Sequence, residues 1–178
     1  MVYTLLAEGF EEIEALTVVD VLRRAEISVK TVSASGDEMV RGGHGIAVKT
    51  DISIDEVEIS DLLFLPGGMP GVTNLENEPK VKDIINRYIH EGKMVAAICA
   101  APSILGKMGI LNGKKATCYP GFENFLEGAD VLTEAVVKDG NVITSRGAGT
   151  AADLAFELVK LFKGEALADK LRTGMIYE

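Results

Sequence analysis

The sequence predicts an α/β fold built on a doubly wound, mostly parallel sheet with helices on both faces and one antiparallel hairpin. Strand-like and helix-like segments alternate along the 178 residues, and this alternation is typical of α/β proteins. Some strand candidates are apolar at every position, which indicates parallel strands that are covered on both faces. The dipeptide Asp139-Gly140 lies between two strand-like segments and predicts the hairpin.

The predicted strands are short runs that end at glycine, proline or small residues. Residues 62–65 and 94–98 are wholly apolar, so we expect them at the centre of the sheet. The other candidates are residues 2–7, 28–33, 116–120, 135–138 and 141–145, a strand that begins at Val131, and two short pieces on either side of a loop at residues 42–45.

The predicted helices are residues 11–25, 79–90, 103–108, 150–163 and 165–172, with a short helical connection in residues 51–58. The first is apolar on nearly all sides, and such a helix is buried on more than one side. Glu14 lies among its apolar residues. A buried carboxyl tends to keep its proton, because burial disfavours the charged form. The alternative is an exposed acid in the first turn, where the helix dipole favours negative charge.

Length and charge restrict the possible classes of protein. A chain of 178 residues is most simply one domain, residues 1–178, and is long enough to bury a core. The net charge of −9 argues against nucleic acids and anionic membranes as partners, because both repel an acidic surface. No basic residue precedes the apolar run at residues 2–6, and no run approaches the ~18 apolar residues of a membrane span. We therefore expect a cytoplasmic protein with reduced cysteines.

Cys99 follows five residues of an apolar strand and precedes small residues and a helix. At such a turn the sulfur lies near free backbone N–H groups, and the positive end of the next helix favours the thiolate. Hydrolases place a nucleophilic serine at the same kind of strand-to-helix elbow. The alternative is a buried thiol that packs as a small hydrophobic group. Cys118 has no evident positive field around it, so we expect Cys99 to be the reactive thiol.

Gly67 and Gly68 directly follow the apolar strand of residues 62–65. Paired glycines at this position expose backbone N–H groups, which can bind an oxyanion; the alternative is an ordinary turn. Three strand candidates end at residues 65, 98 and 145, and ligands of open α/β sheets bind beyond such carboxyl ends. The Gly-x-Gly of residues 147–149 lacks the third glycine and the spacing of a dinucleotide site, which argues against a bound nucleotide. We expect no cofactor and no metal.

Four segments resemble the ThiJ/PfpI superfamily, in particular its branch with the Parkinsonism-associated human protein and its bacterial relatives: residues 11–14, 65–68, 97–102 and 144–150. The resemblance extends over essentially the whole chain. It implies a flavodoxin-like fold, a homodimer, a cysteine at a strained elbow, and a protonated glutamic acid that hydrogen-bonds the sulfur. Transferred to this sequence, it makes Cys99 the nucleophile and Glu14 its partner. It also places Gly67, Gly68 and the Ala100 N–H around an oxyanion.

The sequence departs from the superfamily pattern at two positions. Ala100 follows the cysteine where the peptidase-like branch has histidine, and Tyr119 stands where many relatives of the human protein have histidine. The chain has only two histidines, His44 and His90, so a Cys–His dyad is poorly supported. As further residues of the pocket we expect His44, Cys118, Tyr119 and Arg146.

The resemblance implies a cofactor-independent enzyme of the glyoxalase or deglycase type. Its substrates would be 2-oxoaldehydes or early glycation adducts, so its partners would be small reactive carbonyl compounds or glycated proteins. The Cys99 thiolate would add to the carbonyl carbon while Glu14 moves the proton. One alternative is a redox-sensing protein of oxidative stress, or a chaperone, whose Cys99 is oxidised to sulfinate. An intracellular cysteine peptidase is a weaker alternative, because Ala100 replaces the histidine.

Overall fold

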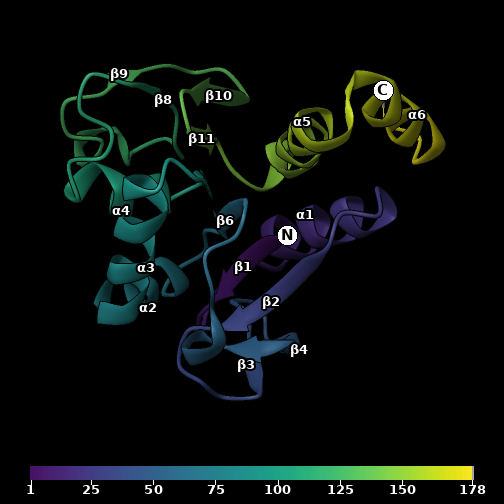
Figure 1. The fold of residues 1–178 in the computed structure, drawn as a ribbon. Coiled ribbons are helices and arrows are strands. Elements are labelled where there is room, and N and C mark those ends of the chain that lie inside the picture. Colours follow the sequence, from purple (N-terminus) through teal and green to yellow (C-terminus); the bar gives the residue numbers. More distant parts are fainter. Residues whose placement is uncertain (178) are drawn as a thin grey trace.

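The computed structural model describes residues 1–177 and contains a seven-stranded sheet between two groups of helices (Figure 1). The strand order is β10-β11-β7-β6-β1-β2-β5. Every pair in this sheet is parallel except β10–β11, which form the predicted hairpin. The structure thus confirms the predicted fold class. Among the described residues, no helix has the length and apolar character needed to cross a bilayer.

The elements alternate along the chain as the sequence indicates. The strands of the main sheet are β1 (Val2–Leu6), β2 (Val29–Ser33), β5 (Ile52–Ser53), β6 (Leu62–Leu65), β7 (Met94–Ile98), β10 (Val136–Asp139) and β11 (Val142–Ser145). The helices are α1 (Glu12–Arg24), α2 (Gly71–Asn77), α3 (Pro79–His90), α4 (Pro102–Lys107), α5 (Ala151–Lys163) and α6 (Glu165–Gly174). Two small two-stranded sheets pair β3 (Met39–Arg41) with β4 (Ala47–Lys49) and β8 (Lys115–Ala116) with β9 (Asp130–Val131), and the 3-10 turns are η1 (Ile54–Glu56), η2 (Glu123–Phe125) and η3 (Ala148–Thr150).

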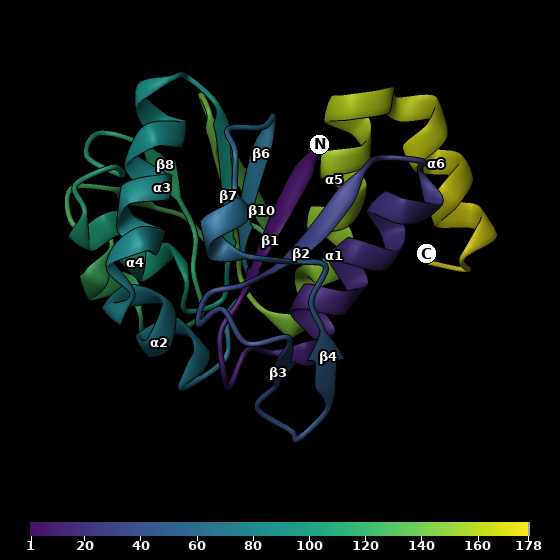
Figure 2. The same cartoon turned by 60° about the horizontal axis from the view of Figure 1, so that its bottom comes forward.

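The sheet is covered on both faces, and this explains the apolar strands. Helices α2, α3 and α4 lie on one side, and α1, α5 and α6 lie on the other (Figure 2). Along β6, Leu63 and Leu65 belong to the core on the α3 side, whereas Leu62 and Phe64 belong to the core on the α1 and α5 side. Successive side chains of a strand point to opposite faces, so a strand between two helical layers must be apolar throughout.

Some connections differ from the prediction. Residues 51–58 form β5 at the edge of the sheet and then η1, in place of one short helical connection. Helix α2 was not predicted, because its sequence is short and largely polar and begins with glycine after proline. In the segment 116–120 only the first residue continues a strand, β8. Residues on both sides of the glycine loop pair as the antiparallel hairpin β3–β4, outside the main sheet.

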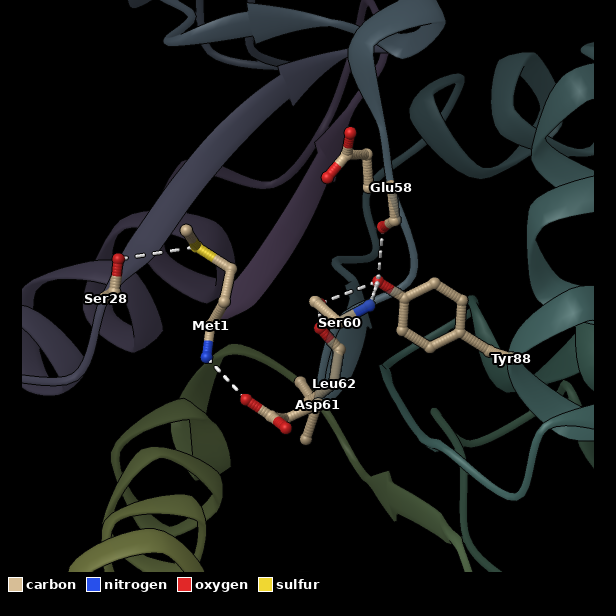
Figure 3. A network of polar contacts seen from close by, with 7 residues as sticks. All are labelled: Met1, Ser28, Glu58, Ser60, Asp61, Leu62 and Tyr88. Carbon is tan, nitrogen blue, oxygen red and sulfur yellow. Dashed lines mark hydrogen bonds and ion pairs between the residues drawn. The ribbon is translucent and has the colours of Figure 1, made fainter.

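Polar contacts fix the amino ends of β1 and β6 (Figure 3). The amino group of Met1 forms an ion pair of 2.6 Å with Asp61. The hydroxyl groups of Tyr88 and Ser60 lie 2.8 Å apart, and the Tyr88 hydroxyl also accepts a hydrogen bond from the Ser60 N–H at 3.2 Å. These contacts connect α3 and the start of the chain to the amino ends of the strands. The loops that bear the predicted site residues lie at the carboxyl ends of the strands, on the opposite side of the sheet.

The neighbouring strands β1 and β6 form the switch point of the sheet. After β1 the chain continues outward through β2 to β5, then returns to the other side of β1 to form β6, and continues to β7. The loops after β1 and β6 therefore leave the sheet on opposite faces and open a crevice between them, where open α/β sheets bind ligands. Glu14 follows β1, and Gly67 follows β6.

A glycine in α4 tests the packing next to this edge. A Cβ at Gly106 would overlap the carbonyl oxygen of Phe125 and lie 2.7 Å from the Leu126 Cα. We expect Gly106→Ala to lower the free energy of unfolding by about 1–3 kcal/mol, because backbone atoms cannot move aside as a flexible side chain can. Gly174→Ala is the matched control, since nothing lies within 4 Å of its added Cβ. Urea unfolding measures both variants, and equal midpoints would contradict the predicted packing.

Candidate active site

Cys99 occupies a sharp turn between β7 and α4. Its φ of 64° lies in the left-handed region, which is costly for any residue other than glycine. Two backbone hydrogen bonds hold it there: the Cys99 N–H donates to the Ser145 carbonyl at 2.9 Å, and the Tyr119 N–H donates to the Cys99 carbonyl at 2.8 Å. The strained elbow that the resemblance implies is therefore present in this chain.

Glu14 is buried beside this turn. Its residue is 1% exposed, so the apolar pattern of residues 11–25 predicted its environment better than its place in the first turn did. The Gly67 N–H donates to Glu14 Oε2 at 2.8 Å, and the carboxyl lies close enough to the Cys99 thiol for the two groups to change each other's pKa. Helix α1, the loop after β6 and the elbow after β7 thus meet at one carboxyl group.

Gly67 allows this close approach. A Cβ at this position would lie 2.5 Å from Glu14 Oε2 and 2.6 Å from the Cys99 Cβ, so only glycine fits between the two side chains. The backbone N–H groups of Gly68 and Ala100 lie near enough to the Cys99 sulfur to oppose the rise of its pKa. These two N–H groups remain the candidate oxyanion donors. The N–H of the third, Gly67, already binds the carboxyl group of Glu14.

The protonation of the pair differs from the expectation in one respect. Burial above all, and then the negative charge of Glu11, raise the pKa of Glu14 to about 7 against the opposing hydrogen bonds. Burial, followed by the charge and hydrogen bond of Glu14, raises the pKa of Cys99 to about 12. The six-residue helix α4, which begins at Pro102, does not offset these effects. Between these two pH values the pair bears one negative charge, and Cys99 becomes a thiolate when Glu14 takes its proton.

The segment of residues 117–119 places its side chains differently. Tyr119 is 50% exposed, whereas Cys118 is 3% exposed and packs in the core on the α3 side. Burial, together with Glu123, raises the pKa of Cys118 to about 11 against the effect of Arg146. The Arg146 guanidinium donates to the Thr133 carbonyl at 3.0 Å. Of the expected pocket residues, Tyr119 is exposed at the elbow. Cys118 is buried in the core, and the Arg146 guanidinium is bound to the Thr133 carbonyl.

His44 binds the start of α1. The Nδ1 of its ring lies 2.8 Å from Glu12 Oε2 and 3.6 Å from Glu11 Oε2. The backbone N–H of His44 donates to Glu12 Oε1 at 2.7 Å. These ligand atoms lie within 4.8 Å of one another, which is close enough for a metal ion, although the protein's own hydrogen bonds already use both oxygens of Glu12. Sequence analysis missed the buried Glu12. The glycine at position 42 is a trace of this burial in the sequence, because any larger residue there would overlap the Glu12 carboxyl.

The two cysteines should differ in their reaction with iodoacetamide. Cys99 is partly exposed and its proton can pass to Glu14, whereas Cys118 is buried and burial raises the pKa of its thiol. At limiting reagent and neutral pH, we expect peptide mapping to find most of the label on Cys99. Cys99→Ser should lose this fast labelling and Cys118→Ser should keep it. Preferential labelling of Cys118 would refute the assignment of the reactive thiol.

Comparisons with known proteins identify the family of this chain. Residues 1–161 match the model of the DJ-1/PfpI family. Protein dj-1beta of Drosophila melanogaster is 36% identical over 97% of this chain and 94% of its own length, and a protein of Pyrococcus abyssi named as a deglycase is 35% identical over 91% and 99%. A solved structure of a mutant DJ-1 superfamily protein from Salmonella typhimurium superposes with a TM-score of 0.96 at 31% identity, over 99% of this chain and 98% of that one. The chain belongs to the DJ-1/PfpI family.

Proposed function

We propose that this protein is a cofactor-independent cysteine enzyme of the glyoxalase or deglycase type, which acts on 2-oxoaldehydes or on early glycation adducts. The observation that supports this most directly is the position of the buried Glu14 carboxyl beside the Cys99 side chain, where the two groups change each other's pKa. It joins a nucleophile to a proton acceptor with a pKa near neutrality. The name of the Pyrococcus abyssi relative supports the same class of reaction.

In the first step, the pair delivers a nucleophile and then a proton. The Glu14 carboxylate takes the thiol proton, and the Cys99 sulfur forms a bond to the aldehyde carbon as the carbon–oxygen π bond breaks. The oxygen gains negative charge near the N–H groups of Gly68 and Ala100, which stabilise it. Glu14 then returns its proton to this oxygen. The product is a hemithioacetal, and Glu14 is again a carboxylate.

The second step is an internal rearrangement. Glu14 removes the proton of the former aldehyde carbon, and the electron pair forms an enediolate with the adjacent ketone carbon. After the hydroxyl proton moves between the neighbouring oxygens, Glu14 protonates the former ketone carbon, which leaves a thioester of a 2-hydroxy acid on Cys99. Water attacks the thioester carbon, the carbon–sulfur bond breaks, and Glu14 passes a proton of the water to the sulfur. The net reaction adds one water molecule to a 2-oxoaldehyde.

Replacement of Glu14 tests its role as acid and base. We expect kcat/KM for methylglyoxal to rise with pH through an apparent pKa near 7, because the fully protonated pair below this pH has no group to accept the thiol proton. Glu14→Gln keeps the size of the side chain but cannot move protons. It should lower lactate formation by about 10²–10⁴-fold and remove this inflection.

Glu11→Gln is the matched control for that experiment. Glu11 raises the pKa of Glu14 through its charge, so this variant should remain active and shift the inflection to lower pH. Wild-type turnover in Glu14→Gln would exclude Glu14 as the acid and base. Absence of lactate from the wild-type enzyme, with activity equal to Cys99→Ser, would exclude the glyoxalase function itself.

A redox role is the second candidate, and the exposure of the sulfur supports it. Cys99 is partly exposed, and the N–H groups of Gly68 and Ala100, which influence the pKa of its sulfur, would bind the sulfinate oxygens. A stoichiometric reaction with peroxide, seen as a mass gain of two oxygen atoms on Cys99 without methylglyoxal turnover, would favour it. A peptidase is not favoured, because His44 binds Glu11 and Glu12, and His90 ends α3.

We propose a homodimer that buries the apolar surface around Glu12. Ile13 is 56% exposed and Ile46 is 55% exposed, and the Ile46 N–H donates to Glu12 at 3.4 Å, so the two apolar side chains come from adjacent segments. Light scattering should give twice the 19.0 kDa monomer mass. Ile13→Glu should produce the monomer, and Phe125→Glu, at a 42% exposed residue next to α4, should not. A monomeric wild-type protein at micromolar concentration would contradict the proposal.

A further inference from the structure

Tyr119 presents a large apolar ring to solvent beside the reactive thiol. Its N–H donates to the Cys99 carbonyl at 2.8 Å, and its residue is 50% exposed. The two preceding residues, Thr117 and Cys118, are buried, so the exposed aromatic ring begins where the segment leaves the core. Burial of aromatic surface is favourable. The exposed part of the Tyr119 ring is therefore apolar surface that a ligand at Cys99 could cover.

Gly147 lies next to this ring and to the Glu14 carboxyl. A Cβ at Gly147 would lie 3.2 Å from the Tyr119 Cδ2, 3.7 Å from its Cε2 and 3.9 Å from Glu14 Oε1. The backbone of Gly147 is extended, with φ 165°, a conformation that any residue can adopt. The requirement for glycine therefore comes from the limited space between the Tyr119 ring and the Glu14 carboxyl. The Tyr119 ring and the Glu14 carboxyl therefore approach the same point from two directions, and Cys99 contacts both residues.

The charges around the pair disfavour anionic ligands. Glu11 lies close enough to Glu14 to raise its pKa, and Glu12 lies beside Glu11 at His44. The guanidinium of Arg146, which influences the pKa of the neighbouring Cys118, donates to the Thr133 carbonyl. A substrate with its own carboxylate would meet like charges here, whereas the tyrosine ring adds apolar surface without charge.

We propose that Tyr119 is the specificity-determining residue of the Cys99 site and that it selects uncharged carbonyl compounds with a planar, aryl substituent over their small aliphatic counterparts. The reacting carbonyl lies at the sulfur between Glu14 and the N–H groups of Gly68 and Ala100, and the substituent stacks on the exposed ring. This inference rests on the proposed function for its natural substrates, and on the position of the ring for its selectivity.

Turnover measures the selectivity. The ratio of kcat/KM for phenylglyoxal to that for methylglyoxal is determined for the wild-type protein, Tyr119→Phe and Tyr119→Leu. We expect the ratio to fall about three- to tenfold in Tyr119→Leu, because an aliphatic side chain loses the aromatic stacking. It should stay at the wild-type value in Tyr119→Phe, which keeps the ring. Circular dichroism and the urea midpoint verify that both variants are folded.

Alkylation separates this inference from the proposed function. The second-order rates of Cys99 with iodoacetanilide and with iodoacetamide are measured in the same three proteins, each divided by the rate with glutathione. A wild-type preference for the aryl reagent that falls in Tyr119→Leu and persists in Tyr119→Phe supports the inference even if no 2-oxoaldehyde is turned over. In that case only the proposed function fails. An unchanged preference in Tyr119→Leu, or an equal loss in Tyr119→Phe, overturns the inference.

Discussion

The rest of the site depends on the close packing of Glu14 against Cys99. Only a glycine at position 67 leaves room for this packing. It needs helix α1, the loop after β6 and the elbow after β7 to meet within hydrogen-bonding distance. It also has a cost. A carboxyl with pKa 4.5 when unfolded and about 7 when folded binds its proton more tightly in the folded state. Stability therefore falls by about 3 kcal/mol as pH rises between these values.

The switch point of the sheet provides this arrangement. Beta strands β1 and β6 are neighbours, but their following loops diverge to opposite faces of the sheet, so a side chain from the helix after one strand can reach the glycines after the other. Polar contacts of Met1 and Tyr88 hold the amino ends of these strands. The layers on both faces fix their spacing. The carboxyl ends are left to form the site.

Much of this was predictable from local sequence, because buried strands and an almost wholly apolar helix leave patterns that need no knowledge of distant residues. The burial of Glu14 followed from such a pattern. The raised pKa of Cys99 did not, because it arises from the burial of the sulfur and from a carboxyl that only the folded chain brings near. The buried Glu12 and the spacing of Tyr119, Gly147 and Glu14 were missed for the same reason. Helix α2 was missed because it is short and polar.

The electrostatics of the pair bear on the choice between an enzyme and a redox sensor. A peroxide sensor reacts through a thiolate that is present at rest, but burial and Glu14 raise the pKa of the Cys99 thiol and so disfavour that thiolate. In the reaction with a 2-oxoaldehyde, the aldehyde oxygen accepts the proton that Glu14 has just taken from the sulfur. Carbon–sulfur bond formation then separates no lasting charge in the buried site. The same burial that slows oxidation of the free thiol therefore favours an addition reaction in which the acid and the nucleophile act on one substrate.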